Sequence, residues 1–285
     1  MAVKAPGARA RQAGVVLAAL LIGALAGCAS PAPTVKRVVL IAPFEGNSRE
    51  IGYDMLYPVR LALADAAAQD IVLVAVDAGE SAEAAAQKAA ALADDPSVLM
   101  ALTAGATAAN EQVFDALGDI PTVVIGQWNA RPSAHVLVMA SADLADQLTS
   151  NEMDVFAAAL ETGVTGGETF GLKAFALLAS EPAGITVLTN AAPADAAFAQ
   201  RLAASGLFVP EPGLLATAAY DSGTLAAEAL AGADTRAEVL AALRETDRRG
   251  INGQLRFDSE GYWLDAPVYT LRYVDGVLRL ADGVD

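Results

Sequence analysis

Three short polar loops carry the residue types that can bind a small ligand. Each follows a run of apolar residues; they span 43–49 (PFEGNSR), 103–107 (TAGAT) and 126–130 (GQWNA). In the second loop, the Thr107 hydroxyl and backbone N–H groups at a helix start can hold a carboxylate or a carbonyl. Phe44 and Trp128, in the other two loops, can supply apolar walls. These residues predict a site for a small polar ligand.

Nine residues of these loops form the predicted ligand-binding set. They are Phe44, Glu45, Thr103, Gly105, Ala106, Thr107, Gln127, Trp128 and Asn129. The 103–106 backbone and Thr107 would contact an anion or a carbonyl, and Glu45, Gln127 and Asn129 would orient the ligand. Arg49 and Tyr220 are secondary candidates. The structural alternative is that the threonines cap a helix, Trp128 covers a strand end and Arg49 is solvated.

Catalysis finds little support in the composition. Catalytic bases are most often histidines, and the chain has a single one, His135, at the start of an apolar strand. One histidine and one cysteine cannot form a histidine- or thiolate-based metal site. The motifs G-x-G-x-x-G, Walker A and G-x-S-x-G are absent from the sequence. We therefore expect that the protein is not an enzyme and that it binds no cofactor and no metal. The weaker alternative is a hydrolase that uses carboxylates alone. Two acidic side chains that converge in a pocket would favour it.

The three loops belong to an alternation of strands and helices. Apolar, β-branched runs predict strands over 37–42, 71–76, 98–102, 120–125 and 135–140. Helical spacing predicts intervening helices over 53–69, 81–93 and 106–117. This alternation indicates βαβ units and an α/β fold, a parallel sheet flanked by helices. Such sheets bind ligands at the carboxyl ends of their strands, where the three loops fall.

The pattern changes after residue 140. Two predicted helices, 143–160 and 171–179, flank a glycine-rich turn at 163–171 (GVTGGETFG). The remaining predicted elements are strand 185–189, helices 194–204, 222–231 and 236–246, and strands 255–258, 267–273 and 277–280. Asp275-Gly276 is the predicted hairpin turn between the last two strands.

The N-terminus has the order of an export signal. Basic residues at 4, 9 and 11 precede an apolar run at 14–25, which is shorter than the roughly 20 residues of a membrane span. The ending Leu25-Ala26-Gly27-Cys28 resembles the bacterial lipobox, whose cysteine receives lipid. This resemblance implies lipidation of Cys28 and an extracytoplasmic place in the cell envelope or periplasm. The formal net charge of −16 argues against nucleic-acid partners, because an acidic surface repels phosphates.

Longer motifs resemble the type I periplasmic binding proteins, and among them the Leu/Ile/Val-binding lipoproteins of ABC importers. The motifs are VVLIAPFEG, IGYDMLYPVRLALADA, DPSVLMALTAGATAANEQ, DIPTVVIGQWNARP, ATAAYDSGTLAAEAL and INGQLRFDSEGYWLDAPVYTLR. They span most of residues 37–130 and 210–275. The resemblance implies two α/β lobes that close over a ligand, with Thr107 at the position of the family's carboxylate-binding hydroxyl.

The sequence departs from the family pattern in two places. Ala130 stands ahead of Arg131-Pro132 where the family has a second ligand-binding threonine. The interval 140–184 is too short for the family's second lobe, which supplies an acidic residue and a tyrosine for the ligand ammonium. No residue is assigned to that acidic contact. We therefore expect one complete Rossmann-like lobe and a reduced second lobe.

The expected organisation has six segments. They are the signal peptide 1–27, a lipidated tether 28–36, the first α/β lobe 37–139, the reduced second-lobe segment 140–184, a return to the first lobe 185–254, and C-terminal strands and hairpin 255–285. The expected function is that of a lipid-anchored extracytoplasmic solute-binding protein, related to ABC importer components for amino acids or similar small polar solutes. Its partners would be that ligand, an importer permease and, through the anchor, the membrane. The alternative is a non-transporting envelope interaction module on a degenerate binding-protein fold.

Overall fold

The computed structural model of the protein describes residues 35–149, 160–161, 163–179 and 181–281. From Val35 onward the chain forms one compact unit. Residues 1–34 lie outside the described part, so the signal peptide, the lipidation of Cys28 and most of the tether stay predictions. Residues 150–159, in the predicted helix 143–160, also lie outside it.

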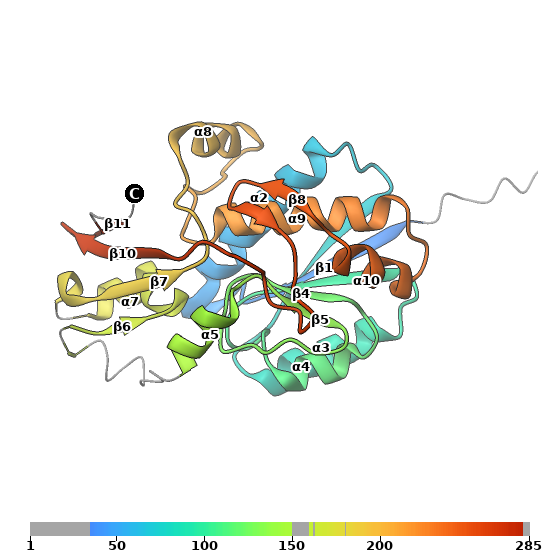
Figure 1. The fold of residues 1–285 in the computed structure, drawn as a ribbon, viewed down its shortest axis with the longest axis horizontal. Helices are drawn as coiled ribbons and strands as arrows, with labels where there is room; N and C mark the ends of the chain where they lie inside the picture. The colour runs from blue at the N-terminus through green and yellow to red at the C-terminus, as the bar shows by residue number, and fades with distance from the viewer. Residues whose placement is uncertain (1–34, 150–159, 162, 180, 282–285) are drawn as a thin grey trace, which may run out of the picture. The chain divides into compact units, whose positions relative to one another are not determined.

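A five-stranded parallel sheet is the centre of the first lobe (Figure 1). In spatial order its strands are β2 (Ile71–Asp77), β1 (Lys36–Ala42), β3 (Val98–Thr103), β4 (Thr122–Val124) and β5 (Val136–Val138). All neighbouring pairs are parallel. β1 and β3 lie inside the sheet and are buried on both faces, which explains their long apolar runs. The predicted α/β fold is confirmed.

Helices cover both faces of this sheet. α3 (Ala82–Ala93) and α4 (Glu111–Leu117) pack on one face, and α2 (Arg49–Asp65), α9 (Ala216–Ala231) and α10 (Arg236–Arg244) pack on the other. α2 and α9 approach closely at Gly223, where a Cβ atom would lie 2.8 Å from Ala62 Cβ and 3.0 Å from Val59 Cα. An alanine at 223 would therefore push the two helices apart.

A second, four-stranded sheet belongs to the small lobe. In spatial order its strands are β11 (Val277–Leu280), β10 (Tyr269–Val274), β7 (Thr186–Thr189) and β6 (Thr165–Gly166). The 3-10 helix η2 (Glu168–Gly171) and α7 (Lys173–Leu178) pack with it around Phe170, Phe175 and Val187. Asp275 and Gly276 both have positive φ, which confirms the predicted hairpin turn between β10 and β11.

Three segments connect the two lobes. They are residues 139–141 between β5 and α5 (Ala142–Thr149), residues 190–195 between β7 and α8 (Ala196–Ala204), and residues 264–268 ahead of β10. The Asn190 side chain joins all three: Oδ1 accepts a hydrogen bond from Ser141 N (3.0 Å), and Nδ2 donates to Pro267 O (2.7 Å). Asn190 is buried and fixes the point where the segments cross.

Three helices begin four or more residues away from the predicted start. α2 begins at Arg49 and not at 53. α4 begins at Glu111 and not at 106, because the Asn110 side chain accepts hydrogen bonds from Gln112 N and Val113 N and caps the helix there. α9 begins at Ala216 and not at 222, because buried small residues extend its packing face toward the N-terminus.

Two predicted strand placements are wrong. The segment 185–254 does not return to the first lobe as a whole, because β7 pairs with β10 and β6 in the small sheet. The return comes with α8, which packs on residues of α2 and α9. In place of strand 255–258, β9 (Gly253–Leu255) pairs with β8 (Arg248–Gly250) in a separate hairpin.

Two of the motifs that carry the family resemblance stabilise turns within residues 250–262. In AYDSG, Asp221 accepts hydrogen bonds from the backbone N–H groups of residues 251–252, both at 2.9 Å. A Cβ atom at Gly250 would lie only 2.6 Å from that carboxylate, so glycine is required there. In FDSEG, Asp258 Oδ1 accepts hydrogen bonds from the backbone N–H groups of residues 260–262. Both aspartates hold turns.

Candidate functional site

The three predicted loops lie side by side at the carboxyl edge of the parallel sheet. They follow β1, β3 and β4, which are neighbours. A Cβ atom at Gly105 would lie 3.0 Å from Pro43, so the second loop touches the first. Ile125 N donates to Thr103 O (2.9 Å), which joins the beginning of the third loop to the second. The topology therefore gathers these loops at one edge.

The third loop folds back on itself around Trp128. Trp128 and Asn129 have φ values of 48° and 58°, a left-handed conformation that non-glycine residues rarely adopt outside functional sites and tight turns. The Trp128 indole Nε1 donates to Ile125 O (2.6 Å), and Gln127 Oε1 accepts a hydrogen bond from Asn129 N (2.6 Å). Trp128 is 8% exposed, so its ring is a fixed wall and not a mobile cover.

Glu168 faces this loop from the small lobe. It belongs to η2 in the glycine-rich turn and is 3% exposed. The carboxylate accepts a hydrogen bond from Thr189 Oγ1 (3.4 Å), at the end of β7, and lies against the first lobe at Gly126, where a Cβ atom would be 3.4 Å from Oε1. Burial raises the pKa of Glu168 from 4.5 to about 7, since removing water disfavours the charged form.

Sequence reasoning did not identify Glu168 as a site residue. The signal is a lone acidic residue between glycines in an otherwise uncharged turn. Those glycines are sterically required: a Cβ atom at Gly167 would lie 2.8 Å from Leu148 Cδ1, and one at Gly166 would lie 2.0 Å from the Phe170 ring. Close packing of the turn is what presses Glu168 against the first lobe.

Asp54 on α2 is the second acidic residue of this region. Its two oxygens accept hydrogen bonds from Gly213 N (2.6 Å) and Leu215 N (3.1 Å). Burial raises the pKa of Asp54 to about 6, against the effect of these two bonds. Glu50, one helical turn earlier, raises that pKa further, and Lys173 lowers it.

A small cavity of about 10 Å³, room for a single water molecule, lies between the two lobes and brings these groups together. It is lined by Ile51, Asp54, Met55, Trp128, Glu168, Leu172, Leu214 and Leu215. Six of the eight side chains are apolar, two are acidic and none is basic. A largely apolar cavity with a few polar groups is the usual form of a small-molecule site, although usual sites measure about 300–1,000 Å³.

Of the predicted set, only Trp128 lines this cavity. Phe44 packs edge-on against Tyr53, and its N–H donates to Asp77 (2.8 Å); Glu45 and Ala106 are exposed. Thr103 and Thr107 do not cap a helix; their hydroxyl oxygens are buried and make no hydrogen bond to any described residue.

The secondary candidates lie elsewhere. Arg49 is exposed at the start of α2. The Tyr220 hydroxyl donates to Asp65 (2.8 Å), beside Arg201 of α8, and Tyr220 also packs against Phe198. Tyr220 therefore docks α8 onto α2 and α9 and does not line the cavity described above.

Asp54 and Glu168 share a pocket, which is the arrangement that a carboxylate-only hydrolase would need. Both Asp54 oxygens, however, accept backbone hydrogen bonds, and Glu168 Oε1 accepts one from Thr189 Oγ1. General acid–base catalysis needs a carboxyl within reach of the substrate proton. The bonding of these two acids suits positioning more than proton transfer to a substrate.

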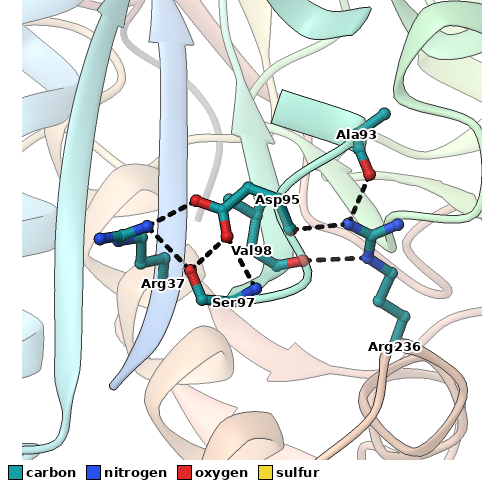
Figure 2. Close-up of polar contacts among 6 residues, drawn as sticks. All are labelled: Arg37, Ala93, Asp95, Ser97, Val98 and Arg236. Carbon is teal, nitrogen blue, oxygen red and sulfur yellow. Dashed lines mark hydrogen bonds and ion pairs between the residues drawn. The ribbon is translucent and has the colours of Figure 1, made fainter. Parts of the chain in front are cut away.

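A contrasting polar network lies at the amino edge of the same sheet (Figure 2). Arg236 donates to the carbonyl oxygens of Ala93, Asp95 and Val98, at 2.9–3.0 Å. Arg37 pairs with Asp95 (2.5 Å) and donates to Ser97 Oγ (2.9 Å). Hydrogen bonds from Ser97, and then Arg37, hold the pKa of Asp95 below its usual range.

Within the described ranges, no group of three or more histidine, cysteine, aspartate or glutamate side chains is placed to hold a metal ion. Among the same residues, none of the helices combines the length and the hydropathy that a membrane span requires.

No protein-family model matches the chain, and no curated protein does. Solved structures do match. An extracellular ligand-binding receptor from Desulfohalobium retbaense is 17% identical, with a TM-score of 0.67, over 87% of this chain and 59% of the receptor. A leucine-binding protein from Thermotoga maritima (14%, TM-score 0.66) matches over 87% of this chain and 98% of its own. A branched-chain amino acid transporter substrate-binding protein from Streptococcus pneumoniae, in complex with isoleucine (15%, TM-score 0.63), matches over 87% and 99%. The likeness concerns the fold, and this chain spans 59% of the length of the receptor.

Proposed function

We propose that this chain, which has the fold of the type I periplasmic binding proteins, is an extracytoplasmic solute-binding protein. It would be anchored by lipid at Cys28 and would deliver an amino acid or similar small polar solute to an ABC importer. The observation that carries the proposal is the cavity between the two lobes, lined by residues of both. Ligand binding by such a cavity stabilises the contact between the lobes and needs no catalysis or cofactor.

The ligands described for the structural neighbours support the solute-binding proposal. The Streptococcus pneumoniae protein is described with isoleucine, and a solute-binding protein from R. palustris is described with benzoate. Trp128 and the apolar lining residues suit a ligand with an apolar body, and the two acids suit one that donates hydrogen bonds.

The tightness of the cavity favours a second candidate. A free volume of about 10 Å³, close to that of one water molecule, is far below that of most ligand sites, and the buried Trp128 ring occupies one wall. A fold whose cleft is already filled would serve as an envelope interaction module that docks a partner protein. Such a module would bind no small solute.

Thermal-shift screening of residues 29–285 against amino acids, amides, sugars and purines separates these candidates. A solute at 100 times its Kd stabilises the native state by about 2.7 kcal/mol, which corresponds to a Tm rise of roughly 5–10 °C in a domain of this size. If no solute changes Tm, the solute-binding proposal fails and the interaction module is favoured.

The two tryptophans provide a matched pair of variants for that screen. Each donates its indole N–H to a backbone carbonyl, Trp128 to Ile125 O (2.6 Å) and Trp263 to Gln254 O (2.8 Å), but only Trp128 lines the cavity. Trp128→Phe should reduce the solute-induced Tm rise. Trp263→Phe should lower Tm and leave that rise intact; equal losses in both variants would place the site elsewhere.

Lipid anchoring needs its own measurement. The wild-type chain, expressed in a bacterium fed a labelled fatty acid, should incorporate the label, and Cys28→Ser should not. Incorporation in both chains would refute anchoring at Cys28.

A further inference from the structure

Glu168 makes a buried contact from one lobe to the other. It extends from η2 of the small lobe, yet its carboxylate packs against the backbone of the 126–127 loop of the first lobe. A Cβ atom at Gly126 would lie 3.4 Å from Glu168 Oε1, so the carboxylate rests directly on that loop. Separation of the lobes would break this contact and expose the carboxylate to water.

The crossing point of the three connecting segments lies next to the same carboxylate. Thr189 Oγ1 donates to Glu168 Oε1 (3.4 Å) and accepts a hydrogen bond from Ala191 N (3.1 Å). The adjacent Asn190 joins the three connecting segments through Ser141 N and Pro267 O. Glu168 thus lies between the crossing point of the connecting segments and the cavity.

Asp54 of α2 is the other titratable residue that lines the cavity with Glu168. Glu50 and Lys173 act on the pKa of Asp54, and the Tyr273 hydroxyl donates to Phe170 O (2.7 Å). The 126–129 loop and β7 carry no titratable residue. Among the described residues, Glu168 forms no salt bridge, although other acidic residues do. An ionised Glu168 would therefore be buried without a paired cation.

We propose that Glu168 is a proton-operated latch: protonated, it holds the small lobe against the loop after β4, and ionised, it leaves that contact and the lobes open. This inference rests on the proposed function, whose cavity the latch would open and close. No covalent change is involved; one proton binds the carboxylate on closure and returns to the solvent on opening.

The direction of the pH dependence follows from linkage. In the open state the carboxyl is hydrated and has its ordinary pKa of 4.5, whereas burial in the closed state raises the pKa to about 7. The closed state thus binds the proton more tightly. Its advantage is fully present below pH 4.5 and is lost as the pH rises through 7. In that interval the closure constant should fall up to about tenfold per pH unit.

The test is small-angle scattering of residues 29–285, together with Trp128 fluorescence of the same chain carrying Trp263→Phe, which leaves Trp128 as its single tryptophan, between pH 4.5 and 9 and without solute. Residues 35–285 form one compact unit. The wild type should change emission and radius of gyration with a midpoint near 7. Glu168→Gln, which cannot ionise, should keep the low-pH signal throughout. Glu50→Gln, the same change on the neighbouring helix, should retain the transition.

A wild type without a transition, or a Glu168→Gln variant that retains it, would overturn the latch. If Glu168→Gln does not fold, as judged by circular dichroism, Glu168→Asp replaces it. Its shorter side chain should move the midpoint toward the ordinary carboxyl range, and an unchanged midpoint would overturn the proposal. The latch and the proposed function can fail separately. If a solute raises Tm but the wild type shows no pH transition, the latch alone is refuted. If the pH transition occurs but no solute raises Tm, the proposed function alone is refuted.

Discussion

The two edges of the parallel sheet differ in how their polar groups are paired. At the amino edge, Arg236 meets three carbonyl oxygens, Arg37 pairs with Asp95, and Lys36 pairs with Asp234. At the carboxyl edge, Thr103 and Thr107 keep buried hydroxyl oxygens without a hydrogen bond to any described residue, and nearby Asp54 and Glu168 have raised pKa values.

This contrast separates stability from function within one sheet. Satisfied charge networks at the amino edge hold β1, β3 and α10 together, whereas unsatisfied or neutralised polar groups cost stability where they are buried. Proteins retain buried polar groups that reduce stability mainly at their binding and catalytic sites. This contrast supports our proposal that the carboxyl edge is the functional one, which is also where parallel sheets bind ligands.

Arg236→Met should have the largest effect on stability. It removes the donors to Ala93, Asp95 and Val98 and leaves three carbonyl oxygens without their partner. We expect a loss of about 3 kcal/mol in the free energy of unfolding, measured in urea at pH 7. Arg201→Ala removes only an exposed pair with Asp65 and should cost less than about 1 kcal/mol. Equal losses would contradict the assignment of the amino edge to stability.

The change in the free energy of unfolding with pH should be nearly as large as the effect of Arg236→Met. It arises at the carboxyl edge. Because burial raises the pKa of Glu168 to about 7, its stabilising contribution is present below pH 4.5 and decreases as the pH rises to 7. The loss should reach at most about 3 kcal/mol, and lobe opening reduces it by returning the carboxylate to water. Chemical unfolding of Glu168→Gln should lack this component. If the variant and the wild type have parallel pH profiles, Glu168 is not a buried titrating group.

The smallest effect compares two buried threonines. Thr103→Val replaces a hydroxyl that has no hydrogen bond to a described residue and should raise the free energy of unfolding by about 1 kcal/mol. Thr189→Val removes a hydroxyl that bonds to both Ala191 N and Glu168, and it should lower that free energy by about 1 kcal/mol. The comparison fails if Thr103→Val destabilises the protein, as judged by urea unfolding.

The parts of the fold that depend on local pattern could be predicted. Long β-branched runs identified β1, β2 and β3, and Asp275-Gly276 identified the last hairpin. The partner of β7 could not be predicted, because a strand's own residues do not specify its neighbour. α4 began late because a single cap, Asn110, overrides an alanine-rich pattern.

The candidate site was predicted less completely than the fold. The three loops and Trp128 followed from their place after strands, which topology alone determines. Glu168 was missed because its burial comes from tertiary packing of η2 against the first lobe, which the sequence pattern of 163–171 does not reveal. The place of Tyr220 in a surface cluster with Asp65 and Arg201 could not be predicted, because such a cluster has no periodic signature.

Hydrogen exchange of residues 29–285, with and without the solute that raises Tm most, tests the central claim directly. The account predicts added protection at 126–129 and at 166–170, on the two sides of the cavity, and none at 93–98 along the amino edge. Protection confined to 93–98, or no change at either wall of the cavity, would contradict it.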